Sequence, residues 1–312
     1  MLTLGADELR RLLDWSSTVG ALESMFRHGC EMPQRHHHTV EVPGAASATM
    51  LLMPAWSVGG HLGVKLVNVF PDNARAGLPA VSGVYLLFSA TNGAPLAMLD
   101  GGELTARRTA AASALAARYL AREDATRLLV VGTGRMAANL AQAHAAIRPI
   151  TTVTVWGREA AKATALSARL VEAGLRARTT DDLEGAVGAA DIVSCATLSR
   201  EPLVQGTWLA PGTHLDLVGG FTPAMREADD EAVRRSSVFV DTRSGATTEA
   251  GDIAAPLANG TLAAEGVRAD LFDLARGLHP GRVGRQEITL FKSVGAALED
   301  LAAAALAYRR AS

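Results

Sequence analysis

The sequence predicts an α/β protein that combines a Rossmann-type, doubly wound parallel sheet with an α+β domain. Beyond Asp124, apolar strands alternate with helical stretches, and a glycine-rich turn joins the first of these strands to its helix. The first third of the chain carries a run of strands without helices between them. Because 312 residues exceed what one hydrophobic core usually organises, we expect two domains.

The first third begins with a helical pattern. Residues 1–15 show amphipathic helical spacing with mixed charges. Three apolar segments rich in Val and Leu, at 49–54, 62–70 and 81–89, are separated by turn signals and are expected to be strands. An Ala-rich helix follows, with Thr105 as its expected N-cap.

The rest of the chain supplies the alternating pattern. Strands are expected at 127–131, 152–156, 191–195, 214–218 and 238–241. The intervening helices include 136–147 and 159–173. The segment from residue 288 onward reads as a short strand or turn followed by an Ala-rich helix.

The composition of the chain indicates which kinds of molecule it can bind. The net charge is -2 and the pI is about 6.5, which gives no electrostatic case for nucleic acid or an anionic membrane. The cysteines, Cys30 and Cys195, are too far apart in sequence for a disulfide framework or a CxxC metal site. No export signal is evident, and Pro and Gly break the long uncharged stretches. We expect a cytoplasmic protein with a small-molecule partner.

The sharpest local motif is the turn between strand 127–131 and the next helix. It has the G-x-G-x-x-A form, in which Gly132 allows a tight turn and Gly134 lets a pyrophosphate approach the backbone. The small Ala137 permits close packing of helix and strand, and the helix start offers N–H groups to phosphates. The motif predicts dinucleotide binding, and the alternative is a tight turn without a ligand.

The end of the second strand bears on the choice of nucleotide. Enzymes that use NAD usually place an acid there to bind the ribose, but this sequence has Trp156, Gly157 and Arg158. Arg158 can pair with a 2'-phosphate, which favours NADP(H). The adjacent Glu159 keeps NAD(H) possible, and Arg158 can also be an ordinary solvated residue.

Three cations stand in unusual surroundings. Lys65 interrupts an apolar strand, Arg108 begins the Ala-rich helix, and Arg35 precedes three histidines. Each can be a structural ion-pair partner, and together they can bind a carboxylate. The histidines, at 36–38, alternate in direction on an extended chain and have no ligand spacing around them, so no metal site is predicted.

Five segments resemble the ornithine cyclodeaminase/mu-crystallin family: 53–56, 62–73, 104–122, 130–137 and 288–304. The resemblance implies an NAD(P)-dependent enzyme that acts on amino acids or cyclic imino acids and forms a homodimer. It also implies a substrate-binding and dimerisation domain made of residues 1–124 with 292–312, and a Rossmann domain made of residues 125–291.

The resemblance also assigns roles. Arg35, Lys65 and Arg108 match the residues that hold the substrate carboxylate, and Val294 falls near the substrate. Apart from the resemblance, we expect Lys65, or a water that it holds, to give the proton to the substrate nitrogen; the alternative is that Lys65 serves only as a charge anchor. The predicted cofactor site consists of Thr109, Gly132, Gly134, Arg135, Met136, Trp156, Gly157, Arg158, Ala196, Thr197, Val218 and Ser293.

One departure from the family bears on the reaction. Ornithine cyclodeaminases carry an aspartate after a pair of glycines, and this sequence has Phe221 there. Because cyclodeamination needs a placed acid/base, the change favours an NAD(P)H-dependent reductase of cyclic ketimines, Δ1-pyrroline-2-carboxylate or Δ1-piperideine-2-carboxylate, giving L-proline or L-pipecolate. The alternatives are ornithine cyclodeaminase itself, which converts L-ornithine to L-proline and ammonia, a non-catalytic binding protein like mu-crystallin, and an enzyme for open-chain imino acids.

Overall fold

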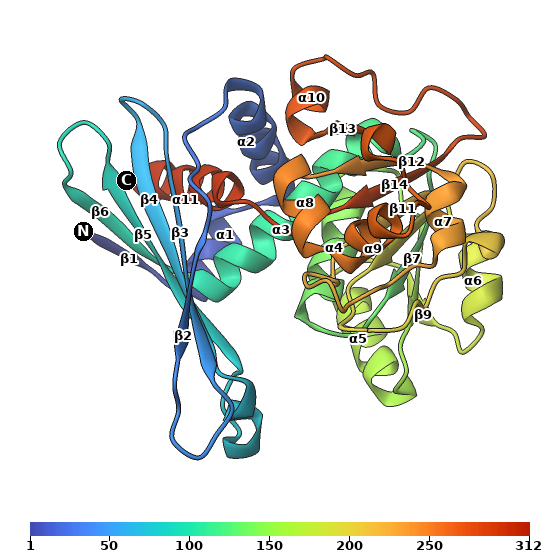
Figure 1. Ribbon diagram of the computed structural model, residues 1–312, viewed down its shortest axis with the longest axis horizontal. Helices are drawn as coiled ribbons and strands as arrows, with labels where there is room; N and C mark the ends of the chain where they lie inside the picture. The colour runs from blue at the N-terminus through green and yellow to red at the C-terminus, as the bar shows by residue number, and fades with distance from the viewer. The chain divides into compact units, whose positions relative to one another are not determined.

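The computed structural model describes residues 1–312, except for the side chain of Ala74. The chain forms two compact units (Figure 1): unit 1 comprises residues 1–108 and 297–312, and unit 2 comprises residues 109–296. Helix α3 (Gly101–Leu120) crosses the boundary. The boundary lies earlier than the sequence predicts, because Ala117 and Ala121 in the second half of α3 pack into a core of unit 2.

Unit 1 is built on a six-stranded sheet in the order β1-β6-β5-β4-β3-β2, in which only the β1–β6 pair is parallel. Its strands are β1 (Leu2–Leu4), β2 (His36–Val40), β3 (Ala48–Trp56), β4 (His61–Val69), β5 (Val81–Ser89) and β6 (Pro95–Asp100). Its helices are α1 (Ala6–Leu12), α2 (Trp15–His28), the 3-10 turn η1 (Pro71–Ala76) and α11 (Ala297–Ala311).

Helix α11 returns from the end of the chain to pack against β3, β4, β5 and β6 (Figure 1). The register of these strands sets Met53, Lys65, Tyr85 and Leu99 in one row across the sheet, and all four are buried. Because alternate residues of a strand point to opposite faces, the row lies on the face that α11 covers. Lys65 is therefore a cation within an otherwise apolar layer.

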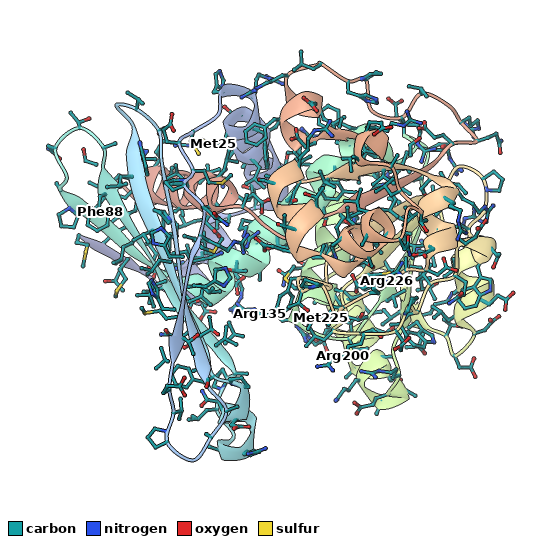
Figure 2. The ribbon with its side chains drawn as sticks, viewed as in Figure 1. Met25, Phe88, Arg135, Arg200, Met225 and Arg226 are labelled. Carbon is teal, nitrogen blue, oxygen red and sulfur yellow. The ribbon has the colours of Figure 1, made fainter. Side chains whose placement is uncertain are left out.

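The other face of the same sheet is apolar but partly exposed. Phe88, labelled in Figure 2, belongs to it. Its members on β3, β4 and β5 are Leu52, Pro54, Trp56, Leu62, Val64, Leu66, Val84, Leu86 and Phe88. We call this set the open sheet face.

Unit 2 contains a parallel eight-stranded sheet in the order β13-β12-β14-β11-β10-β7-β8-β9. Its strands are β7 (Arg127–Val131), β8 (Thr152–Trp156), β9 (Ala177–Thr179), β10 (Ile192–Cys195), β11 (His214–Leu217), β12 (Ser236–Val240), β13 (Val267–Asp270) and β14 (Ile288–Lys292). The chain runs from β7 outward to β9 and then resumes at β10 on the other side of β7. This is the strand reversal of a doubly wound sheet, and ligands bind such sheets at the carboxyl ends of the strands beside the reversal.

The helices of unit 2 are α4 (Arg135–Ile147), α5 (Ala160–Glu172), α6 (Leu183–Ala189), α7 (Asp230–Arg234), α8 (Arg243–Glu249), α9 (Gly251–Ala258) and α10 (Leu271–Ala275), with 3-10 turns η2 (Gly206–Trp208) and η3 (Ala264–Gly266). Separate apolar clusters lie on the two faces of the sheet. One includes Val130, Ala137 and Val153, and the other includes Val131, Val193 and Leu215. The predicted Rossmann architecture is confirmed.

Two predictions about helix starts are wrong. Residues 1–15 do not form one helix, because β1 joins the sheet edge beside β6 and Asp14 caps a second helix by accepting a bond from the Ser17 N–H (3.0 Å). Thr105 lies inside α3 and is not its N-cap. Instead, the Asp100 carboxylate accepts a bond from the N–H of Glu103 (2.6 Å) at the first turn. Among the described residues, no helix is long and apolar enough to span a membrane.

Candidate functional site

The turn after β7 has the shape that a pyrophosphate needs. Gly132 has a φ of +122°, and a Cβ there would lie 2.6 Å from the carbonyl oxygen of Ala196, so only glycine fits. Gly134 is the N-cap of α4, and the space where its side chain would stand is open. Arg135 and Met136 follow in the first turn of the helix (Figure 2 labels Arg135). The first turn of α4 therefore has no side-chain cap, and its N–H groups can bind phosphate oxygens.

Most of the other predicted cofactor residues follow strands that lie side by side with β7. Val131 at the end of β7 pairs with Trp156 of β8 and with Cys195 of β10, while Leu217 of β11 pairs with Lys292 of β14. The structure therefore brings one group of predicted residues to a single edge of the sheet: Trp156, Gly157, Arg158, Ala196, Thr197, Val218 and Ser293. Thr109 lies within α3, and no hydrogen bond or ion pair joins it to this edge among the described residues.

Gly157 and Arg158 differ in what surrounds them. A Cβ at Gly157 would lie 2.4 Å from the Cγ2 of Thr133 in the glycine turn, so any larger residue there requires the Thr133 side chain to turn away. Arg158 is exposed and has no acidic partner in the part of the chain that the structure describes. Glu159 is paired with Lys162 (2.6 Å).

A buried charged network that the sequence did not reveal lies behind this edge. The Glu227 carboxylate accepts bonds from the N–H groups of Thr197 (2.6 Å) and Gly219 (2.7 Å). Asp252 accepts a bond from the N–H of Glu227 (2.7 Å) and pairs with the ammonium of Lys292 (2.9 Å). Burial and the nearby Asp252 raise the pKa of Glu227. These bonds hold the loops after β10 and β11 in place. The sign of this network in the sequence is Lys292, a charged residue at the end of an apolar strand.

Asp241 fixes the loop after β14 in a similar way. Its carboxylate accepts bonds from the N–H groups of Val294 (2.7 Å) and Gly295 (2.6 Å) and from the hydroxyl of Ser293 (3.3 Å). Burial raises the pKa of this carboxyl group, although these bonds oppose the rise. Asp241 thus holds two predicted site residues, Val294 through its backbone N–H and Ser293 through its side-chain hydroxyl.

In unit 1 the structure brings Lys65 and Arg108 to two acids of α11. The Lys65 ammonium lies 2.7 Å from one oxygen of Asp300, and the Nε of Arg108 lies 3.0 Å from the other. The Nη1 of Arg108 lies 2.6 Å from Glu299. All four side chains are at most 6% exposed. Sequence reasoning missed both acids, because Glu and Asp in the first turn of a helix are common.

Electrostatics sets the protonation of Lys65. Burial and then the neighbouring Arg108 lower its pKa to about 8, although Asp300 and Glu299 oppose the shift. Among the described residues, the ion pair of the Lys65 ammonium is with Asp300. Tyr85, its neighbour in the sheet row, has a buried hydroxyl without a hydrogen-bond partner among the same residues. The pKa of Tyr85 is raised by burial and by Asp300.

Arg35 lies directly before β2. His36 of β2 pairs with Leu52, and the next residue of β3, Met53, pairs with Lys65. One more residue of the same register would set Arg35 opposite Met53, on the face that carries Lys65. The three histidines that follow Arg35 are exposed, and no group of His, Cys, Asp and Glu suited to a metal ion is found among the described residues.

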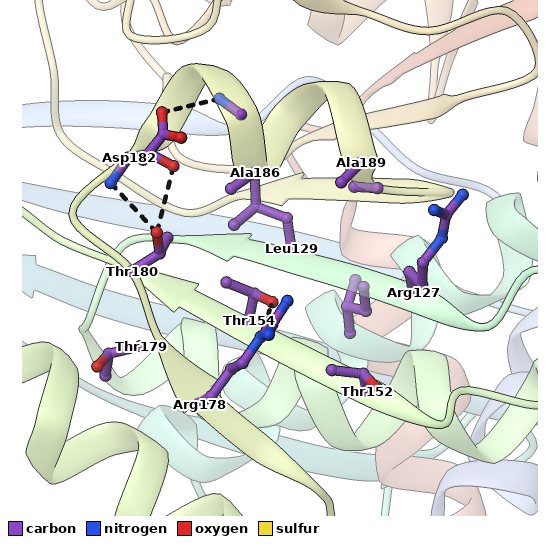
Figure 3. Close-up of a pocket in the computed structure, with 13 residues that line it drawn as sticks. Arg127, Leu129, Thr152, Thr154, Arg178, Thr179, Thr180, Asp182, Ala186 and Ala189 are labelled. Carbon is purple, nitrogen blue, oxygen red and sulfur yellow. Dashed lines mark hydrogen bonds between the residues drawn. The ribbon is translucent and has the colours of Figure 1, made fainter.

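A groove of about 400 Å³ in unit 2 contains none of the predicted site residues (Figure 3). It lies over β7, β8 and β9 beside α6. Of its two arginines, Arg178 donates to the hydroxyl of Thr154 (3.4 Å) and Arg127 pairs with Asp191 (2.9 Å). Its acid, Asp182, accepts a bond from the N–H of Gly185 (2.9 Å). The charged side chains that line the groove therefore already have partners, and the groove is not the candidate active site.

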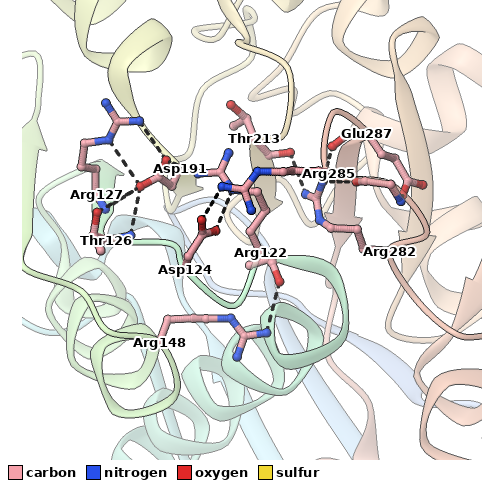
Figure 4. A network of polar contacts seen from close by, with 12 residues as sticks. Arg122, Asp124, Thr126, Arg127, Arg148, Asp191, Thr213, Arg282, Arg285 and Glu287 are labelled. Carbon is pink, nitrogen blue, oxygen red and sulfur yellow. Dashed lines mark hydrogen bonds and ion pairs between the residues drawn. The ribbon is translucent and has the colours of Figure 1, made fainter.

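Asp191 itself is part of a structural network at the start of the strands (Figure 4). Its carboxylate binds Arg122 (2.7 Å) and Arg127 and accepts a bond from the N–H of Thr126 (2.9 Å). Although burial opposes ionisation, these contacts lower the pKa of Asp191. The network anchors β7 and β10 at the end of the sheet opposite to the glycine turn.

The sequence profile of the ornithine cyclodeaminase/mu-crystallin family matches residues 4–312. The chain belongs to this family. It is 42% identical to a Δ1-pyrroline-2-carboxylate reductase of Paracoccus denitrificans over 292 residues, which are 93% of this chain and 90% of that protein.

Solved structures of family members have the same fold. A Δ1-pyrroline-2-carboxylate reductase of Thermococcus litoralis in complex with NADH and L-proline superposes with a TM-score of 0.92 at 34% identity, covering 100% of this chain and 97% of that one. An archaeal alanine dehydrogenase, a dimer with bound NAD, gives a TM-score of 0.90 at 30% identity and covers 100% and 96% of the two chains. The predicted family and fold are confirmed.

Proposed function

We propose that this family member is an NAD(P)H-dependent reductase that converts the cyclic ketimines Δ1-pyrroline-2-carboxylate and Δ1-piperideine-2-carboxylate to L-proline and L-pipecolate. Its similarity to reductases of the first of these compounds supports the reaction class. The observation that carries the choice within the family is Phe221, half-exposed after the paired Gly219 and Gly220, where cyclodeaminases have an aspartate. An aromatic ring cannot transfer the protons that release of ammonia requires.

In the proposed reaction, the residues of this chain have distinct roles. Arg35, Lys65 and Arg108 bind and orient the substrate carboxylate, and Lys65 gives a proton to the ring nitrogen. The bound dihydronicotinamide supplies the hydride that reduces the C=N bond. A pKa of about 8 leaves most Lys65 side chains protonated at neutral pH while keeping the proton transferable.

The nucleotide binds at the edge of unit 2 described above. Uncapped N–H groups at α4 bind the pyrophosphate, with Arg135 and Met136 in the same turn, and Thr109 and Val218 complete the predicted site. The exposed Arg158 favours NADPH over NADH by pairing with the 2'-phosphate, and Gly157 offers no ribose-binding acid beside it.

The decisive assay measures NADPH and NADH oxidation with five- and six-membered cyclic imino acids, and with open-chain pyruvate plus ammonia as a control. Ornithine with NAD+ should release no ammonia. Lys65→Met should lose at least 100-fold in kcat while still binding NADPH. Release of ammonia from ornithine, or full activity of the Lys65 variant, would overturn the proposal.

We also propose that the chain forms a homodimer through the open sheet face. Nine partly exposed apolar side chains on three adjacent strands form the kind of patch that a subunit interface covers. The archaeal alanine dehydrogenase of the same fold is a dimer. Val64→Arg on this face should give a monomer by light scattering, while Val171→Arg, at an exposed valine of α5, should leave the mass unchanged.

A further inference from the structure

Lysine is rare in this chain and is placed selectively. Of 30 basic residues only three are lysines: Lys65, Lys162 and Lys292. Lys162 is 62% exposed, whereas the side chains of Lys65 and Lys292 are 3% and 0% exposed. Arginine stays charged at every physiological pH, whereas a buried lysine can release its proton. The two buried positions are therefore those where a transferable proton is chemically possible.

The two buried lysines differ in their surroundings. Burial disfavours the charge of Lys292, but Asp252 and Glu227 outweigh it and raise its pKa, so this lysine remains an ion-pair partner. The charged groups that shift the pKa of Lys65 are one cation, Arg108, and two acids, Asp300 and Glu299, and its ion pair is with Asp300. Arg35 lies on the same sheet face by the register of β2 and β3. The tyrosine beside Lys65 in the sheet, Tyr85, is neutral. Asp300 is thus the acid that favours the charged form of Lys65 by direct contact, and Glu299 adds to this effect from farther away.

Asp300 divides its carboxylate between two cations. One oxygen lies 2.7 Å from the Lys65 ammonium and the other lies 3.0 Å from the Nε of Arg108. The carboxylate is fully buried on α11, so it cannot move away to solvent. A bridging anion keeps the two cations at a fixed separation and offsets their repulsion. Glu299 pairs directly with the second cation, Arg108 (2.6 Å), and favours the charged form of Lys65 without an ion pair to it.

We propose that Asp300 is a positioning residue for proton transfer: it holds the Lys65 ammonium in its charged form and in a fixed place next to Arg108. This inference rests on the proposed reductase function. In the step, the N–H bond of Lys65 breaks and an N–H bond forms on the substrate nitrogen, while NAD(P)H is oxidised and the C=N bond is reduced. Lys65 is left as a neutral amine, and solvent returns its proton.

The small number of lysines makes the test direct. In protein labelled with ¹⁵N at lysine, only three side-chain signals are present, and Lys65→Met identifies the one that belongs to Lys65. In the unchanged protein this signal should titrate near pH 8. In Asp300→Asn it should titrate at least one pH unit lower, a tenfold loss of proton affinity. Glu299→Gln removes the same charge one residue away and should shift the signal less.

The enzyme's pH profile completes the test. The high-pH limb of kcat/KM should move to lower pH in Asp300→Asn by the same amount as the NMR titration, and Asp300→Glu should restore both toward the original values. If Asp300→Asn does not fold, Asp300→Glu must still shift both readouts together. An unchanged Lys65 titration in a folded variant, or a shifted titration with an unchanged pH profile, overturns the inference. Absence of reductase activity in the unchanged enzyme refutes the proposed function instead, and the NMR titration still reports on the Asp300–Lys65 contact.

Discussion

Replacement of Arg108 should lower both the stability and the activity of the protein, and the two effects can be measured separately. Arg108→Met keeps the aliphatic stem of the side chain but removes its contacts with Glu299 (2.6 Å) and Asp300 (3.0 Å). Both acids are fully buried, so the loss of Arg108 removes a buried positive charge that pairs with each of them. Breaking a buried ion pair on one side costs about 3–5 kcal/mol, and we expect a loss of this size in the free energy of unfolding.

A second change tests whether charge balance is the cause. In Arg108→Met/Glu299→Gln the remaining Lys65–Asp300 pair is neutral overall. We expect the double variant to be more stable than the single variant by about 1–3 kcal/mol. Reductase activity should stay lost in both, because neither has the guanidinium that binds the substrate carboxylate.

The two quantities are measured separately. Unfolding in urea, followed by tryptophan fluorescence, gives the stability, and NADPH oxidation with a cyclic imine gives the activity. A single variant within about 1 kcal/mol of the unchanged protein would show that the cluster does not depend on Arg108. Activity regained in the double variant would remove Arg108 from the substrate site.

Three further changes probe unit 2. Arg158→Ala should raise the KM for NADPH about tenfold and leave that for NADH unchanged, as measured by steady-state kinetics. Gly132→Ala should abolish nucleotide binding in calorimetry, because its Cβ would lie 2.6 Å from the Ala196 carbonyl and its φ is +122°. His214 is buried and neutral with a pKa lowered to about 3 by burial, so the unfolded state binds its proton first. The free energy of unfolding should therefore fall as the pH drops from about 6.5 toward 3, and less steeply in His214→Gln.

The sequence was most informative where the signal is local. The turn at Gly132 and Gly134 is determined by backbone conformation within a few residues, and strands such as 127–131 are apolar runs that only a covered sheet can bury. Lys65 was noticed because a charge in an apolar strand needs a partner. These signals were enough to predict the Rossmann architecture. They were also enough to single out Lys65 and Arg108, two members of the ion-pair cluster that these residues form with Glu299 and Asp300.

The features that the sequence did not predict depend on packing between residues that lie far apart in the chain. Glu299 and Asp300 lie about two hundred residues from Arg108, and nothing near them shows that α11 buries them. Glu227 and Asp252 were missed for the same reason. The edge strand β2 was missed because its residues, including His36 and His38, are exposed and polar and give no apolar alternation.

The order of the two units along the chain has a consequence for biosynthesis. Unit 2 is one continuous stretch of the chain, so the ribosome synthesises all of unit 2 before α11. Until those final residues emerge, Lys65 and Arg108 lack their counter-ions, and the sheet of unit 1 lacks the helix that covers its inner face. A chain truncated before residue 297 would therefore contain the whole of unit 2, whereas its unit 1 would lack α11.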